Sequence, residues 1–384
     1  MFTDTLNPVF NPGLEGVIAA QTRLSSVDGQ AGELIIAGFP VEELAGKATF
    51  EETLYLLWHD ALPTASQLET FQAALAAYRP LSETALTLLR GAAQARVPVM
   101  DALRMAASTL SVQPGGALGD DSQENALAVV AAFPTIVAAY WRLLQGQEPV
   151  APRPELSHAT DYLSMLTGQD PSPEQVRGLE TYLNTVVDHG LNASTFAARV
   201  IIATQSDMIS AIVGAVGALK GPLHGGAPGP ALDMVFEIGQ ADQAEAYLRA
   251  KLERGERLMG FGHRIYKVRD PRAEVLSAAA ERFYQVDGNL ALYELAKAVE
   301  HTAVDLLAEF KPGRKLQTNV EFYTALLLHG LELPTELFTP TFAIGRVGGW
   351  TAHCFEQQAL GRLIRPQSVY SGPKDREWIA VDWR

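Results

Sequence analysis

The spacing of hydrophobic and polar positions predicts helices along most of the chain and strands in one short region. Glu33-Leu34-Ile35-Ile36 is typical of a strand and follows the turn-forming run Val27-Asp28-Gly29-Gln30, so a small β element is expected between about residues 16 and 38. Beyond it the pattern is helical, and the first long helix is expected to begin at Phe50 and end near Leu62-Pro63. The pattern therefore predicts a mainly α fold with a small N-terminal β element.

Proline and glycine separate the later helices. The clearest breaks are Ala151-Pro152-Arg153-Pro154, Asp170-Pro171-Ser172-Pro173, Gly221-Pro222 and Lys311-Pro312-Gly313. Because strands do not alternate with helices, the pattern does not fit a doubly wound nucleotide-binding fold. The sequence also contains neither a P-loop nor a complete dinucleotide-binding fingerprint.

The segment from Met208 to Leu219 is apolar on every side and rich in glycine and alanine. A helix of this kind is expected to be buried, and its small residues allow close contact with another helix. Two interpretations stay open at this point: a helix in the core of one chain, or a helix at an interface between subunits.

Composition narrows the class of protein. The 384 residues are 47% hydrophobic and 19% charged, which is typical of a globular protein large enough for two domains. The formal net charge of -14 argues against nucleic acid or an anionic membrane as a general partner, so an anionic ligand would need a local cluster of arginines. The single cysteine, Cys354, excludes a disulfide within the chain and a cysteine zinc site.

Two features of the sequence bear on location. Residues 1–8 lack the basic and then apolar pattern of a signal peptide. The longest apolar stretch, Ala126 to Trp141, is interrupted at Pro134 and falls short of the roughly 20 residues that a membrane-spanning helix needs. We therefore expect a soluble, cytoplasmic protein.

Three histidines stand in unusual settings. They are His189 in Asp188-His189-Gly190-Leu191-Asn192, His224 in Pro222-Leu223-His224-Gly225-Gly226, and His263 in Gly260-Phe261-Gly262-His263-Arg264. Flanking glycines let a ligand approach closely, and imidazole is well suited to exchange protons near neutral pH. Each of them, taken alone, could equally be a structural histidine, and Gly-x-Gly is weak evidence for phosphate binding.

Three charged residues are further candidates. Asp270-Pro271-Arg272 reads as an N-cap followed by proline at the first helical position, which would fix Arg272 for binding a carboxylate; the alternative is a surface charge. Glu321 follows Thr318 at capping-box spacing, so the residues alone favour a cap over a catalytic carboxylate. Arg346 lies among Gly345, Gly348 and Gly349, where a charge needs a bound anion or a buried carboxylate.

Together these segments resemble the citrate synthase family over nearly the whole chain. Four motifs of its active site occur in order over about 135 residues. They are Asp188-His189-Gly190-Leu191-Asn192-Ala193-Ser194-Thr195-Phe196, Leu223-His224-Gly225-Gly226-Ala227, Gly260-Phe261-Gly262-His263-Arg264 through Asp270-Pro271-Arg272, and Asn319-Val320-Glu321-Phe322-Tyr323. Four motifs in order outweigh the structural interpretation of the histidines.

The resemblance implies an almost entirely helical fold with two domains that close over the substrates. The large domain would comprise residues 1–224 and 332–384, and the small domain residues 225–331. Members of the family act at least as homodimers, which would place the segment Met208–Leu219 at the interface. The family condenses acetyl-CoA with oxaloacetate and hydrolyses citryl-CoA to citrate and CoA, and no metal or redox cofactor is implied.

The resemblance also implies a role for each motif residue. Glu321 would remove a proton from the acetyl-CoA methyl group, His224 would donate a hydrogen bond to the enolate oxygen, and His263 would polarise and protonate the oxaloacetate carbonyl. The carboxylates of oxaloacetate would be held by His189, Arg272, Arg346 and, from the second subunit, Arg365. The residues expected to face CoA are Arg264, Lys267, Arg314, Lys315 and Asn319.

Two departures from the family pattern affect the prediction. Glu321 stands where the family usually has aspartate, and the extra methylene displaces the carboxylate by about 1 Å, which can cost on the order of 100-fold in rate. Ala227-Pro228 replaces a common Ala-Asn and changes the wall beside His224. The leading hypothesis is a citrate synthase of the short dimeric type. The alternatives are a 2-methylcitrate synthase that uses propionyl-CoA, a weakly active regulatory paralogue that binds ligands and, more distantly, a metal-dependent hydrolase.

Overall fold

The computed structural model describes residues 10–113, 116–225, 229–263, 265–286 and 289–384. Helices make up 60% of the structure, so the expected mainly α fold is confirmed. The helices are α1 Val41–Leu44, α2 Phe50–His59, α3 Ala65–Ala77, α4 Glu83–Gln94, α5 Val99–Ala107, α6 Ser122–Leu144, α7 His158–Thr167, α8 Pro173–Val186, α9 Ala193–Ile202, α10 Met208–Leu219, α11 Gly229–Ile238, α12 Ala244–Glu253, α13 Pro271–Val286, α14 Leu290–Phe310, α15 Val320–Gly330 and α16 Phe338–Leu360.

The expected β element is an antiparallel sheet of three strands, β1 Ser25–Asp28, β2 Glu33–Ile36 and β3 Phe39–Pro40. The strand Glu33–Ile36 is confirmed residue for residue, but the turn lies two residues later than predicted, because Ser25 to Asp28 pair with Ile36 to Glu33. The turn packs on the loop before α13, where the Lys267 N–H donates to the Gly29 carbonyl at 2.8 Å. A second pair, β4 Val112–Gln113 and β5 Gly116–Ala117, lies apart from this sheet.

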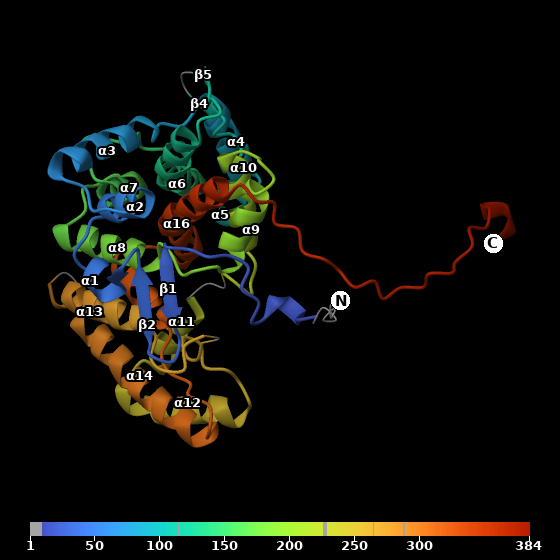
Figure 1. Cartoon of the computed structure of the whole chain (residues 1–384). Helices are drawn as coiled ribbons and strands as arrows, with labels where there is room; N and C mark the ends of the chain where they lie inside the picture. Colours follow the sequence, from blue (N-terminus) through green and yellow to red (C-terminus); the bar gives the residue numbers. More distant parts are fainter. Residues whose placement is uncertain (1–9, 114–115, 226–228, 264, 287–288) are drawn as a thin grey trace.

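Two 23-residue helices, α6 and α16, form the centre of the larger helical group (Figure 1). Helix α16 packs against α2, α6, α8, α9 and α10, and most of its length is buried. Helices α11 to α15 form a second group at the lower end of Figure 1, joined to the first where α13 packs on α8 and α1. The division into two closing domains, with boundaries at residues 225 and 331, stays a prediction.

Among the described residues, one helix, α6, is long and apolar enough to cross a membrane. It is longer than the apolar run at its centre, because the helix continues through Pro134 and includes polar flanks. However, 72% of its most apolar window is buried inside the protein, as expected for the central helix of a bundle.

Helix α10 is buried on one side only. Met208, Ile212 and Leu219 face α5, α6, α9 and α16, whereas Val213 and Gly217 are half-buried on the opposite side. The prediction of a fully buried helix is therefore wrong for a single chain, and its apolar outer side stays available for an interface.

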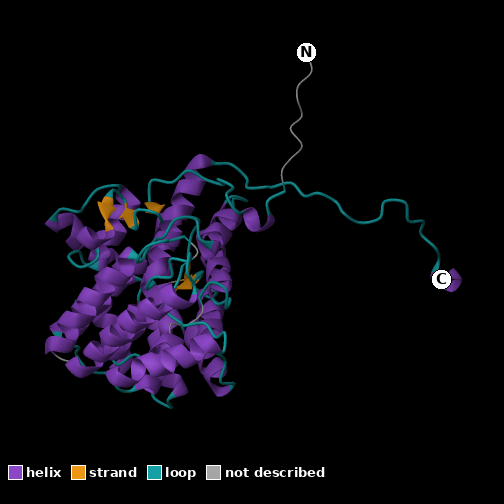
Figure 2. Ribbon diagram, turned by 90° about the horizontal axis from the view of Figure 1, so that it is seen from below, coloured by secondary structure: helices purple, strands orange, loops and turns teal. Residues whose placement is uncertain are grey.

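The last 24 residues leave the body as an extended tail with one short 3-10 turn at Val381–Trp383 (Figures 1 and 2). Much of its apolar surface is open to solvent: Trp378 is 81% exposed, Val381 73% and Trp383 82%. An isolated chain gains nothing from presenting large aromatic side chains to water, so the tail has the character of a segment that packs on another surface.

Candidate active site

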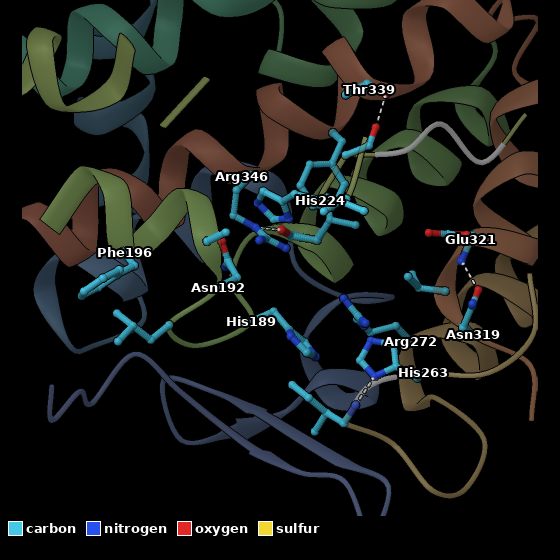
Figure 3. A pocket seen from close by; sticks show the side chains of 18 of the residues that line it. His189, Asn192, Phe196, His224, His263, Arg272, Asn319, Glu321, Thr339 and Arg346 are labelled. Atoms are coloured by element: carbon cyan, nitrogen blue, oxygen red, sulfur yellow. Dashed lines mark hydrogen bonds between the residues drawn. The ribbon is translucent and has the colours of Figure 1, made fainter. Parts of the chain in front are cut away.

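A cavity of about 820 Å³ lies between the two helical groups (Figure 3). Seven of the predicted site residues line it, and they come from segments that are far apart in the sequence. These seven are His189, His224, His263, Arg272, Asn319, Glu321 and Arg346. The expectation that separate motifs assemble into one site is therefore met in the geometry, while the role of each residue stays a prediction.

His224 follows α10 and is held by the start of α9. Its Nε2 lies 3.3 Å from the Ser194 backbone nitrogen and 2.7 Å from the Ser194 hydroxyl, which also donates to Asn192 Oδ1 at 2.8 Å and accepts a hydrogen bond from Trp350 Nε1 at 3.0 Å. Because a backbone N–H can only donate, Nε2 accepts, and the imidazole proton is on Nδ1. Burial, and then Arg346, lower the pKa of His224 to about 4. The group is a neutral hydrogen-bond donor at neutral pH.

The glycine after His224 serves the chain itself. A Cβ atom at Gly225 would lie 2.2 Å from the Leu219 carbonyl oxygen, so no larger residue fits. The packing of the chain therefore explains why residue 225 is glycine, without the expected role of making room for a ligand. The other half of the glycine pair, together with Ala227-Pro228, lies outside the described residues.

His263 is fixed in the opposite tautomer. Its Nδ1 accepts hydrogen bonds from the backbone N–H groups of Ile265 and Tyr266, both at 3.1 Å, so the proton is on Nε2. Burial, and then Arg272, lower its pKa to about 4. His263 is therefore a second neutral N–H donor at the cavity.

His189 lies beside His263, with ring centroids 5.9 Å apart, and its Nε2 is 3.1 Å from the Tyr266 hydroxyl. Burial, followed by the charges of Arg272 and Arg346, lowers the pKa of His189 well below its ordinary value. All three predicted histidines are therefore uncharged, and the positive charge of the site comes from its arginines.

Arg272 is fixed as expected by its position in the first turn of α13. Asp270 precedes the helix and accepts hydrogen bonds from the Arg272 backbone N–H and Nε, both at 3.0 Å, and from Nη2 at 2.8 Å. The predicted N-cap is confirmed, and the surface-charge interpretation is wrong because the side chain is 5% exposed. One edge of the guanidinium is thus occupied by Asp270, which leaves Nη1 for the cavity.

Arg346 is a buried cation without an ion pair among the described residues. Its Nε donates to the Val186 carbonyl at 2.6 Å, and its guanidinium lies 4.6 Å from the centre of the Phe342 ring. Burial lowers the pKa of Arg346 to about 10, which leaves the group charged at neutral pH. A buried charge that faces a cavity without a counter-ion is expected where an anion binds.

Glu321 is the second residue of α15, and its carboxylate lines the cavity. The capping-box interpretation is wrong: the N-cap is Asn319, whose Oδ1 accepts from the Glu321 backbone N–H at 2.9 Å. Burial raises the pKa of Glu321, and Arg272 and Arg257 partly offset this effect. The carboxylate makes no hydrogen bond to another described residue, so it is free to act on a bound molecule.

Of the other five predicted residues, the four that the structure describes do not line the cavity, and Asn319, which does, is bonded to the protein itself. Lys267, Arg314 and Lys315 are exposed and do not line the cavity, and Arg365 is exposed in the C-terminal tail. Asn319 lines the cavity, but its amide binds the Gly262 carbonyl at 2.9 Å. Arg264 lies outside the described residues. A single chain therefore brings together the groups predicted to bind oxaloacetate, except Arg365, and leaves most of those predicted for CoA at the surface.

The sequence interpretation missed several residues that hold the site together. Ser194 holds His224, Trp350 in turn donates to the Ser194 hydroxyl, and Tyr266 contacts His189. One signal could have revealed Trp350: Arg346 and Trp350 are four residues apart, which places both on one face of a helix. The cavity wall also includes residues 13–17 of the N-terminal segment, for which the sequence offered no signal.

The arrangement defines an enzyme pocket for acid–base chemistry on an anionic molecule, and comparisons with known proteins agree with it. Residues 13–367 match the family model for the C-terminal domain of citrate synthase. The citrate synthase of Haloferax volcanii is 40% identical over 379 residues, covering 97% of this chain and 98% of the relative. The 2-methylcitrate synthase of Mycobacterium tuberculosis is 39% identical over 379 residues, covering 96% and 92%.

A solved structure is also similar. The ternary complex of carboxymethyl coenzyme A and oxaloacetate with the citrate synthase of Thermoplasma acidophilum has a TM-score of 0.86 at 29% identity, covering 98% of this chain and all of that chain. The chain belongs to the citrate synthase family, whose members are acyltransferases that need no metal or other cofactor and use the CoA thioester as a substrate. The resemblance inferred from the motifs is thereby confirmed.

Proposed function

We propose that this protein condenses acetyl-CoA with oxaloacetate and hydrolyses the citryl-CoA product to citrate and CoA. One observation carries the proposal: two neutral imidazoles of opposite and fixed tautomer, His224 and His263, line one cavity with the carboxylate of Glu321. This combination suits an aldol-type condensation, which needs one proton acceptor and a hydrogen-bond donor at each of two oxygen atoms.

Oxaloacetate would bind at the cationic part of the cavity. Arg346 and the free edge of Arg272 supply the charge for its carboxylates, and His189 adds a hydrogen bond. The Nε2–H of His263 would then donate to the ketone oxygen. Arg365 would complete the site from a second subunit.

Glu321 would take a proton from the acetyl-CoA methyl group, whose C–H electron pair becomes the enolate. The Nδ1–H of His224 would stabilise the enolate oxygen. The enolate carbon would then attack the ketone carbon of oxaloacetate, and the ketone oxygen would take the proton from His263. Water would finally cleave the thioester. The proton on Glu321 and the two protons of water would restore His263 and protonate the CoA thiolate, and one proton would be released with the new carboxylate. Burial raises the pKa of Glu321, which makes its carboxylate a stronger base.

Propionyl-CoA is the main alternative acyl donor. The mycobacterial 2-methylcitrate synthase is about as similar to this chain as the citrate synthase relative. One methylene changes binding by only about 1–3 kcal/mol, so small differences in the pocket decide the preference. The regulatory paralogue is less well supported. That hypothesis assumed that Glu321 only caps a helix, whereas Asn319 caps α15.

We infer that the protein acts as a homodimer, with Arg365 contributed across the interface. The apolar outer side of α10 and the exposed aromatic residues of the tail support this, because both need a covering surface. CoA contacts by Lys267, Arg314, Lys315, Asn319 and Arg264, and a cytoplasmic location, stay predictions.

The function is tested by thiol release from purified protein with oxaloacetate, using acetyl-CoA and propionyl-CoA in parallel. Faster turnover with acetyl-CoA supports a citrate synthase, and faster turnover with propionyl-CoA moves the assignment to 2-methylcitrate synthase. No release with either donor would contradict both. Unchanged activity in EDTA excludes the metal-dependent hydrolase.

The shared site has its own test. Arg365→Ala and Glu321→Gln homodimers are each expected to be nearly inactive, but subunits mixed at random should recover about a quarter of the wild-type activity. Half of the dimers are then mixed, and one of the two sites in each is intact. If mixing restores nothing, Arg365 does not act across the interface.

A further inference from the structure

A second group of polar side chains is buried behind His189, outside the cavity. His353 on α16 and Asp188 are fully buried, and Arg199 on α9 is 1% exposed. None of the three lines the cavity. Buried polar groups are costly unless they are well bonded, so an arrangement of this kind calls for an explanation.

The contacts of His353 define its protonation. Arg199 Nη1 lies 2.9 Å from His353 Nδ1, and a guanidinium can only donate, so Nδ1 accepts. The ring is therefore neutral, with its proton on Nε2, which donates to Asp188 Oδ1 at 3.1 Å. Arg199 is itself held in place by Glu356 Oε2 at 2.9 Å and Gln357 Oε1 at 3.1 Å.

The second oxygen of Asp188 reaches the N-terminal sheet. Ser25 on β1 donates its hydroxyl to Asp188 Oδ2 at 2.5 Å and accepts the Gly190 N–H at 2.7 Å. Hydrogen bonds thus hold the residues on both sides of His189: Asp188 is bonded to α16, and Gly190 to β1. Helix α16 approaches this segment closely, since a Cβ atom at Gly349 would lie 2.2 Å from the Val187 carbonyl oxygen.

We propose that His353 is a positioning residue which, through Asp188, fixes the backbone of His189 and so sets the affinity for oxaloacetate. This inference rests on the proposed function, because it assigns the effect to the oxaloacetate side of the site. His353 touches no substrate, and the sequence interpretation gave it no role. It acts by supplying one donor to Asp188 and one acceptor to Arg199 at the same time.

These two contacts can be separated by substitution. In His353→Gln the amide nitrogen takes about the position of imidazole Nε2 and can still donate to Asp188. In His353→Asn the amide oxygen takes about the position of Nδ1 and can still accept from Arg199, but Asp188 loses its donor. The proposal requires the two variants to differ, whereas a histidine that only fills space predicts similar losses in both.

The experiment measures kcat and the two KM values of the full-length dimer with each variant. We expect His353→Asn to raise the KM for oxaloacetate about tenfold, and His353→Gln to raise it less than about threefold. For both variants, kcat at saturation and the KM for acetyl-CoA should change less than about threefold. Equal losses in the two variants, or a loss confined to kcat, would overturn the proposal.

A second pair of variants covers the case in which the α16 variants fail to fold. Ser25 is half-buried on β1, and its removal should raise the KM for oxaloacetate about fivefold. Ser26→Ala is the matched control, because Ser26 is exposed on the opposite side of the same strand. If Ser25→Ala behaves like Ser26→Ala, the connection through Asp188 does not act on the site.

Turnover by the wild-type protein tests the proposed function independently of the role of His353. Absence of turnover with either acyl-CoA contradicts the proposed function. In that case calorimetry tests the role of His353, because His353→Asn and Ser25→Ala must bind oxaloacetate more weakly than the wild-type protein does.

Discussion

The two walls of the cavity are held by different means. The helix wall comprises residues 188–194, residues 221–225 and α16, and side chains fix it: Trp350 holds Ser194, which holds His224. The loop wall comprises residues 260–272 and the start of α15, and the backbone fixes it. There the main-chain N–H groups of residues 265 and 266 hold His263. The position of His224 therefore depends on the side chains that lie behind it, and the position of His263 on the path of the backbone.

The two arginines differ in another respect, namely how the charge of each is balanced. Arg272, on the loop wall, is paired with Asp270 before any ligand arrives, so its charge is already balanced. Arg346, on the helix wall, is buried without a carboxylate partner among the described residues and is supported by a carbonyl and a ring. The loop wall is thus stable when empty, while the helix wall retains a charge that only an anion can compensate.

The largest effect is expected at Glu321, the only carboxylate on the loop wall that lacks a hydrogen bond among the described residues. Glu321→Gln should lower kcat about 1000-fold, because the proton acceptor is lost, while oxaloacetate binding changes less than about threefold. Steady-state kinetics and calorimetry measure the two. Glu321→Asp keeps the carboxylate but retracts it, so a smaller loss of at most about 100-fold is expected. A Gln variant that keeps more than a tenth of kcat would show that the base is elsewhere.

The arginines give the second largest effect and test the contrast directly. Arg346→Gln should raise the KM for oxaloacetate about 100-fold, yet lower the free energy of unfolding by only about 1 kcal/mol, the value of one hydrogen bond. Arg272→Gln leaves Asp270 buried without its partner and should lower the free energy of unfolding by about 3–5 kcal/mol. Urea denaturation without ligand measures both. Equal loss of stability in the two variants would abolish the distinction between the walls.

The pH dependence of kcat/KM tests the two histidines, because His224 lies on the helix wall and His263 on the loop wall. The pKa values of His224 and His263 are both lowered to about 4, so the working neutral forms persist as the pH falls from 8 to about 5. Below about pH 4, kcat/KM should approach a fall of about 100-fold per pH unit, because both rings must be neutral and each contributes about tenfold. Protonation of Glu321 acts in the same direction. Because burial raises the pKa of Glu321, an acid limb near pH 6.5 contradicts the lowered histidine pKa values only if it persists in Glu321→Gln.

The lowered pKa values also affect folding. The unfolded state binds protons more readily below pH 6.5, so the contribution of both histidines to stability is complete above about pH 6.5. It is lost as the pH falls through about 4. Urea denaturation at each pH of the kinetic profile separates this loss of structure from loss of chemistry.

The smallest effect concerns the backbone of the loop wall. Gly260 has φ +86°, and a Cβ atom there would lie 3.0 Å from Phe322 Cβ. Gly260→Ala should lower the free energy of unfolding by about 1–2 kcal/mol and raise the KM for oxaloacetate about threefold, because the Gly260 carbonyl binds the Asn319 N–H at 3.0 Å. Gly255→Ala is the control, with φ +76° and open space around it. It should lose similar stability and keep wild-type kinetics; a kinetic effect at both positions would contradict the proposed link.

Features that depend on near neighbours could be predicted from the sequence. The strand Glu33–Ile36 and the Asp270 cap before Arg272 each rest on contacts within a few residues. The same local reasoning failed at Glu321, because Thr318 is not the N-cap. Its hydroxyl binds the buried carboxylate of Glu300, so Asn319 caps the helix instead. Here a tertiary contact displaced a local pattern.

Features that depend on distant partners could not be predicted. Trp350 and Ser194 are 156 residues apart, and His353 and Asp188 are 165 residues apart. Neither pair leaves a signal in a single sequence, because only the packing of α16 on α9 and on α8 brings the partners together. The CoA residues present the reverse case: Arg314 and Lys315 were predicted from family resemblance and lie exposed outside the cavity of one chain.

The spacing of functional residues on α16 limits which changes of length the chain can accept. Arg346, Trp350 and His353 are separated by four and three residues, so they lie on one face of the helix. One inserted residue rotates everything after it by about 100°. An insertion between Arg346 and Trp350 would therefore turn Trp350 and His353 away together while leaving Arg346 in place. The exposed loop at residues 311–315 has no such constraint, and we expect length variation among relatives there and none within this part of α16.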